Sequence, residues 1–328
     1  LFSGMGFSSL LGQPTVVQTL SRALTGGHLA HAYRFEGPDG VGKELAALQL
    51  AQALVCDQGD PLGCETCSAC RRAVTFHPEP PRVPQHPDVL FVQRGLYPAS
   101  VLGSGSEATG IGVEQIRRIV LGRVGFPPHE GRALCIIVRD AHELTLSAAN
   151  ALLKTLEEPA PRTHFILLTN QPRRLLDTIR SRTLAVRFRP LPEQIVGDLL
   201  EARGVPREVA AFAGGSVSQG LALAEEEART ARERFVAAAD AALAAPDLAG
   251  ALPLAEQRPE ERDQLLQLLS HLAHTYALRA RAAIREETDE AQRLAERYGV
   301  VTRAMTDLQR NGQAGLVLEA MVTQLRRT

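Results

Sequence analysis

The segment RFEGPDGVGKELAALQLAQALVC, residues 34–56, decides the fold prediction. It begins as the end of an apolar strand, passes through a glycine-rich turn and continues in a helical pattern. The turn matches the G-x4-G-K spacing of a phosphate-binding loop, in which backbone N–H groups and a helix N-terminus attract an anion. The alternative is a glycine turn with a surface lysine. We predict a nucleotide site, which would use Gly37, Gly40, Gly42, Lys43, Glu44 and, from a later strand, Asp140.

Two positions depart from an active nucleotide site. A Ser or Thr hydroxyl normally follows the lysine and holds Mg²⁺, whereas this chain has Glu44, whose charge repels phosphates. The run LCIIVRDAHEL, 134–144, places Arg139 and Asp140 where an active ATPase carries an acidic pair. We interpret Arg139 as a second, independent defect. We therefore expect ATP and Mg²⁺ to bind weakly or not at all, and we expect no intrinsic enzymatic activity.

The order of periodic segments predicts an α/β fold followed by helices. Up to about residue 190, apolar runs alternate with helical patterns, which is typical of a mostly parallel sheet covered on both faces. The predicted strands are 32–37, 88–93, 133–138, 164–169 and 184–188, and the predicted helices are 43–55, 113–124 and 145–158. The Gly- and Ser-rich segment 94–112 predicts a loop.

After Pro190 and Pro192 every periodic segment is helical. The predicted helices are 193–203, 206–213, 218–245, 258–287, 289–298 and 302–327. We predict three domains: a nucleotide-binding-like α/β domain over 1–188, a small helical domain over 189–246 and a helical bundle over 247–328.

Four of the five cysteines lie in CDQGDPLGCETCSAC, as Cys56, Cys64, Cys67 and Cys70. In a reducing compartment, C-x7-C-x2-C-x2-C spacing favours a metal site over disulfides. Four thiolates form the closed, tetrahedral shell of a structural zinc site. We predict such a zinc module over 56–70; the alternative is four reduced cysteines in a loop. Cys135, within an apolar run, predicts a buried small side chain.

Composition excludes several classes of protein. The net charge of −1 argues against a strongly basic nucleic-acid binder, so DNA contact is expected to be indirect or limited to a few phosphates. No apolar run approaches the roughly 18 residues of a membrane helix, and the first residues lack the pattern of a signal peptide. We expect a cytoplasmic protein without membrane contact. No Ser-His-Asp arrangement or paired-carboxylate motif is evident.

Two long segments resemble bacterial clamp-loader AAA+ subunits. GQPTVVQTLSRALTGGHLAHAYRFEGPDGVGK, 12–43, is similar to their opening, and SAANALLKTLEEPAPRTHFILLTNQPRRLLDTIRSR, 147–182, to the segment that follows their acidic strand. The four-cysteine insert also fits the family. The resemblance covers about 7–190 and is only architectural beyond. It implies an AAA+ domain, a helical lid over 189–246 and a collar for oligomerisation over 247–328. The implied role is in loading the DNA polymerase III sliding clamp during replication.

The departures from the pattern of an active site help to decide which type of clamp-loader subunit the chain resembles. In GGSVSQGLAL, 214–223, Ser218 stands where an active subunit would place an arginine that senses the γ-phosphate. Together with the changes at Glu44 and Arg139, this favours a noncatalytic subunit of delta-prime type. One alternative is a gamma/tau-type ATPase in which Glu44 and Asp140 jointly hold Mg²⁺. Another is a nucleotide-gated regulator from a different AAA+ branch, which the cysteine insert and the Ser-Arg motif disfavour.

One functional motif is retained. TIRSRT, 178–183, keeps the Ser-Arg of the family's Ser-Arg-Cys motif, with Thr183 in place of the cysteine. The resemblance implies that Arg182 is an arginine finger in a neighbouring subunit's ATP site, with Ser181 setting its turn. The alternative is a surface arginine in an arginine-rich strip. The implied partners are the gamma/tau ATPase and delta subunits of a hetero-oligomer, the sliding clamp through that complex, and primer–template DNA, mostly indirectly.

Two further sets of polar residues have less defined roles. Asn150, Lys154 and Glu157 share one helix face, which either hydrogen-bonds across a subunit boundary or is solvated. Thr169 or Asn170 occupies the place where the family puts a polar residue near the γ-phosphate.

Overall fold

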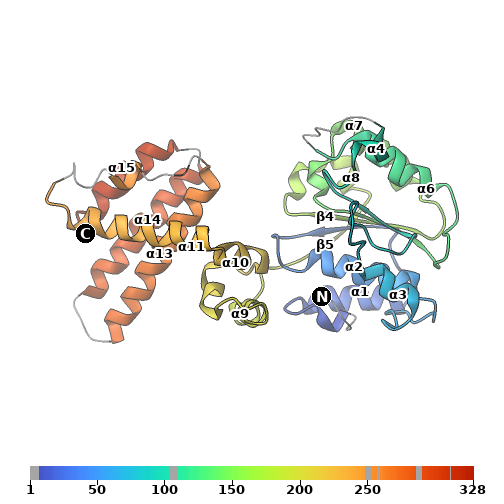
Figure 1. Ribbon diagram of the computed structural model, residues 1–328, viewed down its shortest axis with the longest axis horizontal. Coiled ribbons are helices and arrows are strands. Elements are labelled where there is room, and N and C mark those ends of the chain that lie inside the picture. Colours follow the sequence, from blue (N-terminus) through green and yellow to red (C-terminus); the bar gives the residue numbers. More distant parts are fainter. Residues whose placement is uncertain are drawn as a thin grey trace. The chain divides into compact units, whose positions relative to one another are not determined.

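The computed structural model describes residues 7–103, 110–247, 253–256, 259, 261–285, 290–310 and 312–328 (Figure 1). The chain forms two compact units. The first runs to Val196 and includes Gly214–Ser218, and the second comprises Gly197–Ala213 and the chain from Gln219 onward. The division into three domains stays a prediction.

The first unit is built on a five-stranded sheet. Its strands are β1 (Ala32–Glu36), β2 (Val89–Val92), β3 (Leu134–Val138), β4 (Thr163–Thr169) and β5 (Leu184–Arg187). The order is β2-β3-β4-β1-β5, and every neighbouring pair is parallel. This confirms the predicted parallel sheet. All five predicted strands form, each within one or two residues of the predicted bounds.

Helices lie on both sides of this sheet, with α1 to α3 on one side and α4, α6, α7 and α8 on the other (Figure 1). The helices of this unit are α1 (Pro14–Thr25), α2 (Lys43–Val55), α3 (Ser68–Val74), α4 (Ala99–Leu102), α5 (Val113–Gln115), α6 (Gly122–Val124), α7 (Leu146–Glu157) and α8 (Asp177–Arg180). Short 3₁₀ turns occupy Phe7–Ser9, Ala141–Glu143 and Pro172–Arg174. The core between sheet and helices includes Ile136, Phe165 and Leu152, all fully buried.

The structure refines two predictions in this unit and adds a helix, α1, to them. The predicted helix 113–124 is helical throughout, but Ile116–Leu121 is a π-helix between α5 and α6. The predicted loop 94–112 contains α4, and its residues 104–109 lie outside the described residues. Helix α1 has no counterpart in the prediction, although Pro14 at its first turn is a common start signal.

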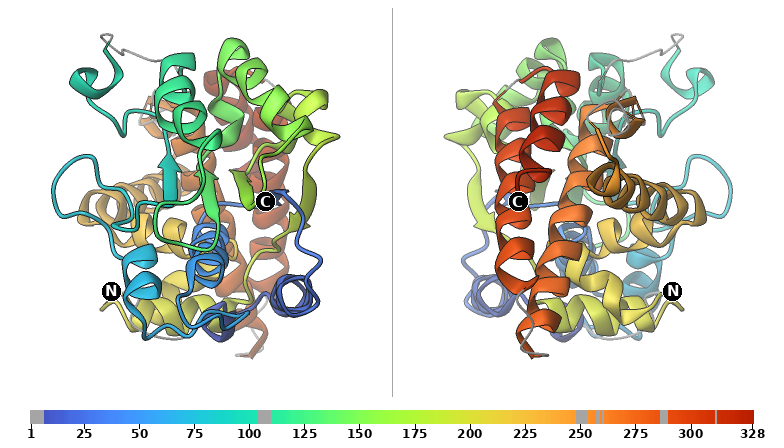
Figure 2. Two further views of the ribbon diagram at one scale, coloured as in Figure 1. Left: turned by 90° about the vertical axis from the view of Figure 1, so that its right-hand side faces the viewer. Right: turned by 90° about the vertical axis from the view of Figure 1, so that its left-hand side faces the viewer.

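The second unit is entirely helical in its described residues, as predicted. Helix α9 (Glu193–Glu201) leads into it from the first unit, and a 3₁₀ helix covers Arg207–Phe212. The remaining helices are α10 (Val217–Ala224), α11 (Glu226–Ala244), α12 (Pro253–Glu256), α13 (Arg262–Arg285), α14 (Glu290–Gln309) and α15 (Ala314–Leu325). Helices α13 and α14 pack along each other (Figure 2). Leu265, Leu269, Leu272 and Tyr276 of α13 recur at helical spacing in the core.

Two predicted helix boundaries in this unit are wrong. The predicted helix 218–245 is broken at Glu225, whose ψ of 136° is extended. The predicted interruption between 298 and 302 does not exist, because α14 runs through Gly299 and buries Val300 and Val301. Core packing of these two valines outweighs the low helix propensity of the glycine before them. The break lies after Gln309 instead.

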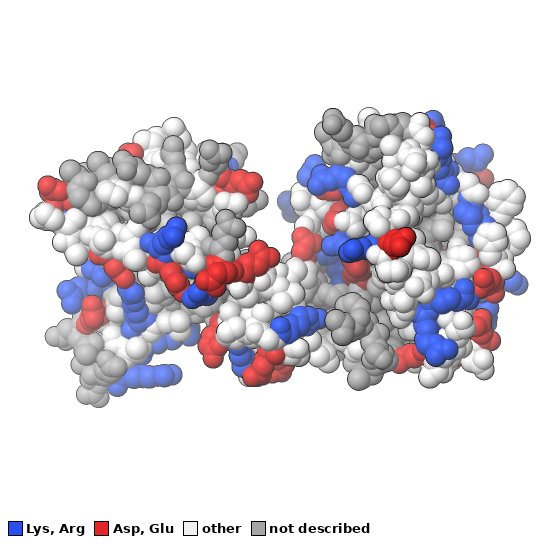
Figure 3. All heavy atoms as spheres, in the orientation of Figure 1, with Lys and Arg blue, Asp and Glu red and all other residues white. Residues whose placement is uncertain are grey.

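The surface carries charges of both signs. On the face drawn in Figure 3, acidic and basic side chains are interspersed in each unit, consistent with the net charge of −1. No helix among the described residues combines the length and the apolar character needed to cross a membrane.

Candidate functional site

The predicted phosphate-binding loop joins β1 to α2. Gly40 and Gly42 have φ angles of 69° and 98°, in the left-handed region that favours glycine. A Cβ on Gly40 would overlap the side chain of Ser218, so a glycine is required there for a second reason. Helix α2 begins at Lys43 directly after the loop, which leaves its N-terminal N–H groups beside the turn.

The lysine of the loop turns back onto the loop itself. Lys43 Nζ donates to the carbonyl oxygens of Gly37 and Pro38 over 2.6 and 2.5 Å, and it lies 3.2 Å from Asp39 Oδ1. Its side chain is only 9% exposed. Burial lowers the pKa of Lys43, although the nearby Asp39 carboxylate opposes that shift. The ammonium group therefore has a full set of partners within its own loop.

The two departures seen in the sequence meet in space. Arg139 Nη1 lies 3.1 Å from Glu44 Oε2, and Arg139 Nε lies 3.7 Å from Asp140 Oδ2. A guanidinium thus stands between the two carboxylates that would have to hold Mg²⁺. Arg139 is therefore not a defect independent of Glu44, as the sequence had suggested, because the charges of the two side chains compensate each other.

The segment Ser216–Ser218 lies against the same loop. Val217 N donates to Gly40 O over 3.1 Å, and the hydroxyls of Ser216 and Ser218 are 3.2 Å apart. Ser218, where the resemblance led us to expect an arginine in an active subunit, lies directly against Gly40 of the loop. Asn170 Nδ2 donates to Asp39 Oδ2 over 2.5 Å from another side.

The polar residue at the end of β4 is engaged as well. Thr169 Oγ1 accepts from Gln171 N over 3.0 Å and lies 3.3 Å from His142 Nδ1. Thr169 is fully buried. Its hydroxyl therefore supports the turn after β4.

The retained Ser-Arg pair forms an ordered turn after α8. Arg182 Nη1 donates to Thr178 O over 3.0 Å and to Ser181 Oγ over 3.2 Å. Arg182 Nη2 pairs with Glu157 Oε1 at 2.6 Å, at the end of α7. The Arg182 side chain is 34% exposed. The exposed Asn150 and Lys154 lie on the same helix as Glu157, on the face that the sequence predicted.

A residue that sequence reasoning missed fastens this turn to the sheet. Arg34 of β1 is 8% exposed, and its Nη1 donates to Thr183 Oγ1 over 2.7 Å and to Arg180 O over 2.9 Å. Thr183 in turn donates to Ile179 O over 2.9 Å. Thr183, where the resemblance led us to expect a cysteine, thus supplies a hydroxyl that accepts from Arg34. The available signal was a charged residue between two apolar neighbours of the strand, Tyr33 and Phe35.

We expect Arg34→Met to lower the free energy of unfolding by about 3 kcal/mol, because it leaves the Glu36 carboxylate, whose side chain is only 14% exposed, without its close partner. Arg34 Nε lies 2.5 Å from Glu36 Oε1. Arg187→Met is the matched control, since Arg187 is 84% exposed and lies 3.7 Å from the other Glu36 oxygen. It should cost less than about 1 kcal/mol. Urea unfolding of both variants tests this, and equal losses would refute the structural role of Arg34.

The four cysteines converge as predicted. All four sulfur atoms lie within 4.8 Å of one another, and Cys64 Sγ is 3.9 Å from Cys70 Sγ. A tetrahedron with Zn–S bonds of 2.3 Å has edges of about 3.8 Å. Cys56 ends α2, and Cys67 and Cys70 lie in the first turn of α3, a helix that the sequence did not reveal. The cluster can hold a metal ion.

Backbone amides point at these sulfur atoms. The N–H groups of Cys64, Cys67 and Cys70 each lie 3.4 Å from the sulfur of another cysteine of the cluster. The N–H of Cys67, first among the causes, lowers the pKa of the Cys64 thiol to about 6. Burial raises the pKa of Cys70. Amides that stabilise thiolates support a metal-binding arrangement. Cys135, outside the cluster, is fully buried as predicted.

Comparisons with known proteins agree on one group. Residues 12–192 match the family model described as DNA polymerase III, delta subunit. The chain is 34% identical over 201 residues to DNA polymerase III subunit delta' of Bacillus subtilis, covering 60% of this chain and 54% of that protein. It is 36% identical over 194 residues to DNA polymerase III subunit gamma/tau of Mycobacterium tuberculosis (strain H37Rv), covering 59% and 30%. The aligned region spans about half or less of these curated relatives.

A solved structure gives a more distant match. It is the DNA polymerase III gamma subunit-related protein of Thermotoga maritima, which aligns over 94% of this chain and 98% of its own, with 20% identity and a TM-score of 0.36.

Proposed function

Because this chain belongs to the family described as DNA polymerase III, delta subunit, we propose that it is a noncatalytic clamp-loader subunit of delta-prime type. It takes part in ATP-driven loading of the sliding clamp onto primed DNA without hydrolysing ATP itself. The observation that carries this proposal is the position of Arg139 between Glu44 and Asp140.

The contacts around the loop support an inactive nucleotide site. Mg²⁺ bound by Glu44 and Asp140, as the gamma/tau-type alternative requires, would first have to displace the Arg139 guanidinium. Phosphates would compete with the loop carbonyls for Lys43, and Ser218 contacts Gly40. Each of these steps costs contacts that the folded chain already makes. The residues therefore do not fit MgATP in this arrangement.

The contacts of Arg182 support a role toward a neighbouring subunit. Its guanidinium is partly exposed and holds a carboxylate, Glu157, whose charge matches that of a phosphoryl oxygen. An exposed ion pair of this kind is worth about 1 kcal/mol or less, so exchange of Glu157 for a phosphate is inexpensive. Thr178 O and Ser181 Oγ accept from Nη1 of Arg182, and these hydrogen bonds can persist during that exchange. We therefore assign Arg182 as an arginine finger acting in trans.

We also propose that the cysteine cluster holds a structural zinc ion. The sulfur spacing fits tetrahedral coordination, and four protein ligands leave no position open for catalysis. The zinc would fix the insert against α2, whose end supplies Cys56. Within the proposed assembly, 1–188 is the AAA+ domain, 189–246 the lid and 247–328 the collar that meets the gamma/tau and delta subunits.

Reconstitution tests this function. The purified chain is mixed with gamma/tau and delta subunits, and ATP turnover is measured with and without clamp and primed DNA. We expect the chain to enter a stable hetero-oligomer and to be required for the turnover that clamp and DNA stimulate. Failure to assemble, or equal stimulated turnover without the chain, would contradict the proposal.

A further inference from the structure

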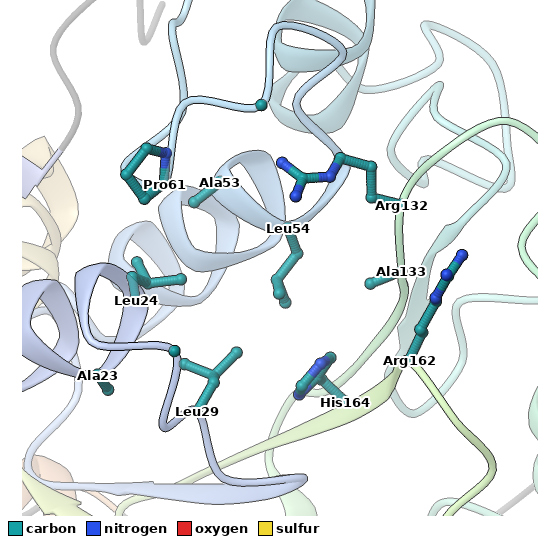
Figure 4. A pocket seen from close by; sticks show the side chains of 12 residues that line it. Ala23, Leu24, Leu29, Ala53, Leu54, Pro61, Arg132, Ala133, Arg162 and His164 are labelled. Atoms are coloured by element: carbon teal, nitrogen blue, oxygen red, sulfur yellow. The ribbon is translucent and has the colours of Figure 1, made fainter.

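A cavity of about 510 Å³ lies in the first unit, far along the sheet from the phosphate-binding loop. Its lining includes Ala133 and Arg162, which directly precede β3 and β4, whereas the loop follows the end of β1. Parallel strands begin at one edge of a sheet and end at the other, so the cavity and the loop occupy opposite edges. Figure 4 shows the cavity between the ends of α1 and α2 and these strand starts.

The walls of the cavity are aliphatic and its edge is basic. Apolar side chains of α1, α2 and the segment after α1 form the walls, namely Ala23, Leu24, Leu29, Ala53 and Leu54. Arg132 reaches over the cavity from above in Figure 4, and Arg162 stands at its side. No lining residue is acidic. The pocket thus combines an apolar interior with two guanidinium groups.

Arg132 and Arg162 differ from other arginines of this unit in their ion pairs. Arg72 pairs with Glu130 at 2.5 Å, and Arg123 pairs with the buried Asp88 at 2.9 Å. In the part of the chain that the structure describes, neither Arg132 nor Arg162 has a carboxylate within ion-pair distance. Their charges remain available to an anionic ligand.

The backbone holds both arginines in place. Arg162 has a φ of 61°, a conformation that non-glycine residues rarely adopt, and its carbonyl accepts from Leu134 N over 2.8 Å. Such strained positions cluster at binding sites. Arg132 follows residues 129–131, whose three N–H groups donate to the fully buried Asp88 carboxylate over 2.7 to 2.8 Å. The guanidinium groups are therefore carried on fixed points of the chain.

His164 is a third polar side chain in the lining of the cavity. His164 Nδ1 lies 3.1 Å from Ala30 O, and because a carbonyl only accepts, Nδ1 carries the proton. Burial lowers the pKa of His164, which keeps the ring neutral. Its Nε2 is then an acceptor, suited to an N–H of a ligand.

We propose that this pocket binds the carboxyl terminus of a partner polypeptide that ends in an aliphatic residue. A terminal carboxylate matches the planar fork of a guanidinium, and the last side chain matches the walls of Leu24, Leu29 and Leu54. The backbone N–H of the terminal residue faces the acceptor of His164. A nucleotide fits less well, because no Phe, Tyr or Trp lines the pocket to stack on a base. This inference does not depend on the proposed role at the nucleotide site.

N-acetyl-leucine, which copies a leucine terminus, tests the proposal, with N-acetyl-leucinamide as the uncharged control. Both are titrated into the ¹⁵N-labelled full chain and followed by chemical shifts. We expect a Kd of about 1 mM for the acid, typical of so small a ligand, and binding of the amide at least about tenfold weaker. Equal binding of acid and amide, or no binding of the acid, overturns the proposal.

Variants locate the site and separate binding from folding. Arg132→Gln and Arg162→Gly should each weaken the binding of N-acetyl-leucine by about tenfold or more. Glycine accepts the φ of Arg162 without strain, so Arg162→Gly should keep or raise the melting temperature. Arg82→Gln, an exposed arginine outside the pocket lining, should leave binding unchanged. If both pocket variants bind N-acetyl-leucine as tightly as the unaltered chain, the ligand does not bind in this pocket and the proposal fails. The proposal also fails if octanoate binds more tightly than every N-acetyl amino acid with an aliphatic side chain.

Discussion

Arg182→Ala is expected to lower ATP turnover at the neighbouring subunit's site by about 10³-fold or more in the reconstituted complex. The reason is that a guanidinium which neutralises charge on the transferred phosphoryl group contributes roughly 10³–10⁵ in rate. The loss should appear in the chemical step, while assembly remains intact, because the contacts of Arg182 within its own chain are a partly exposed ion pair and exposed hydrogen bonds. Single-turnover hydrolysis in a complex with one functional ATPase site next to this chain measures it.

Two further variants serve as controls for that experiment. Arg173→Ala removes an exposed arginine nine residues before Arg182 and should leave turnover unchanged. Glu157→Gln frees Arg182 from its partner at 2.6 Å and should not slow turnover. If Arg173→Ala and Arg182→Ala lower the rate equally, the effect comes from net charge, and the finger assignment fails.

Cys64→Ser is expected to abolish stoichiometric zinc binding and to unfold the insert 56–70. Structural zinc sites contribute an apparent binding free energy of about 10–16 kcal/mol in zinc-finger peptides, and the segment between Cys56 and Cys70 has few apolar side chains to replace it. The parallel sheet, with its own core, should remain folded. Metal analysis, together with hydrogen exchange over 57–74, distinguishes local from global loss.

Cys135→Ala serves as the control for this loss, because Cys135 is buried in β3 away from the cluster. It should keep the full zinc content. A Cys64→Ser chain that exchanges amide protons over 57–74 as slowly as the unaltered chain would show that metal does not hold the insert.

Local patterns in the sequence were sufficient for the sheet and for the cysteine cluster. The strands are short apolar runs bounded by turns, and the C-x2-C spacing constrains sulfur positions through the first turn of a helix. The break in the C-terminal helices was misplaced, because burial of Val300 and Val301 is a tertiary effect that local propensity does not contain.

The pairings that define the candidate sites were beyond local reasoning. Arg139 meets Glu44 only because β3 ends beside the start of α2, which depends on the order of strands. Arg34 and Thr183 are separated by 149 residues and meet across neighbouring strands β1 and β5. The cavity lined by Arg132 and Arg162 likewise combines four separate stretches of chain that share no motif.

Binding and hydrolysis of MgATP by the isolated chain tests most directly whether its own nucleotide site is inactive. Calorimetric titration and a sensitive phosphate-release assay should show no saturable binding and no turnover at millimolar MgATP. Lys43→Ala and Lys154→Ala, which replace the chain's two lysines in turn, should then behave alike in both assays. Turnover that Lys43→Ala abolishes and Lys154→Ala preserves would contradict this, and would make the protein a working ATPase despite the Arg139–Glu44 pair.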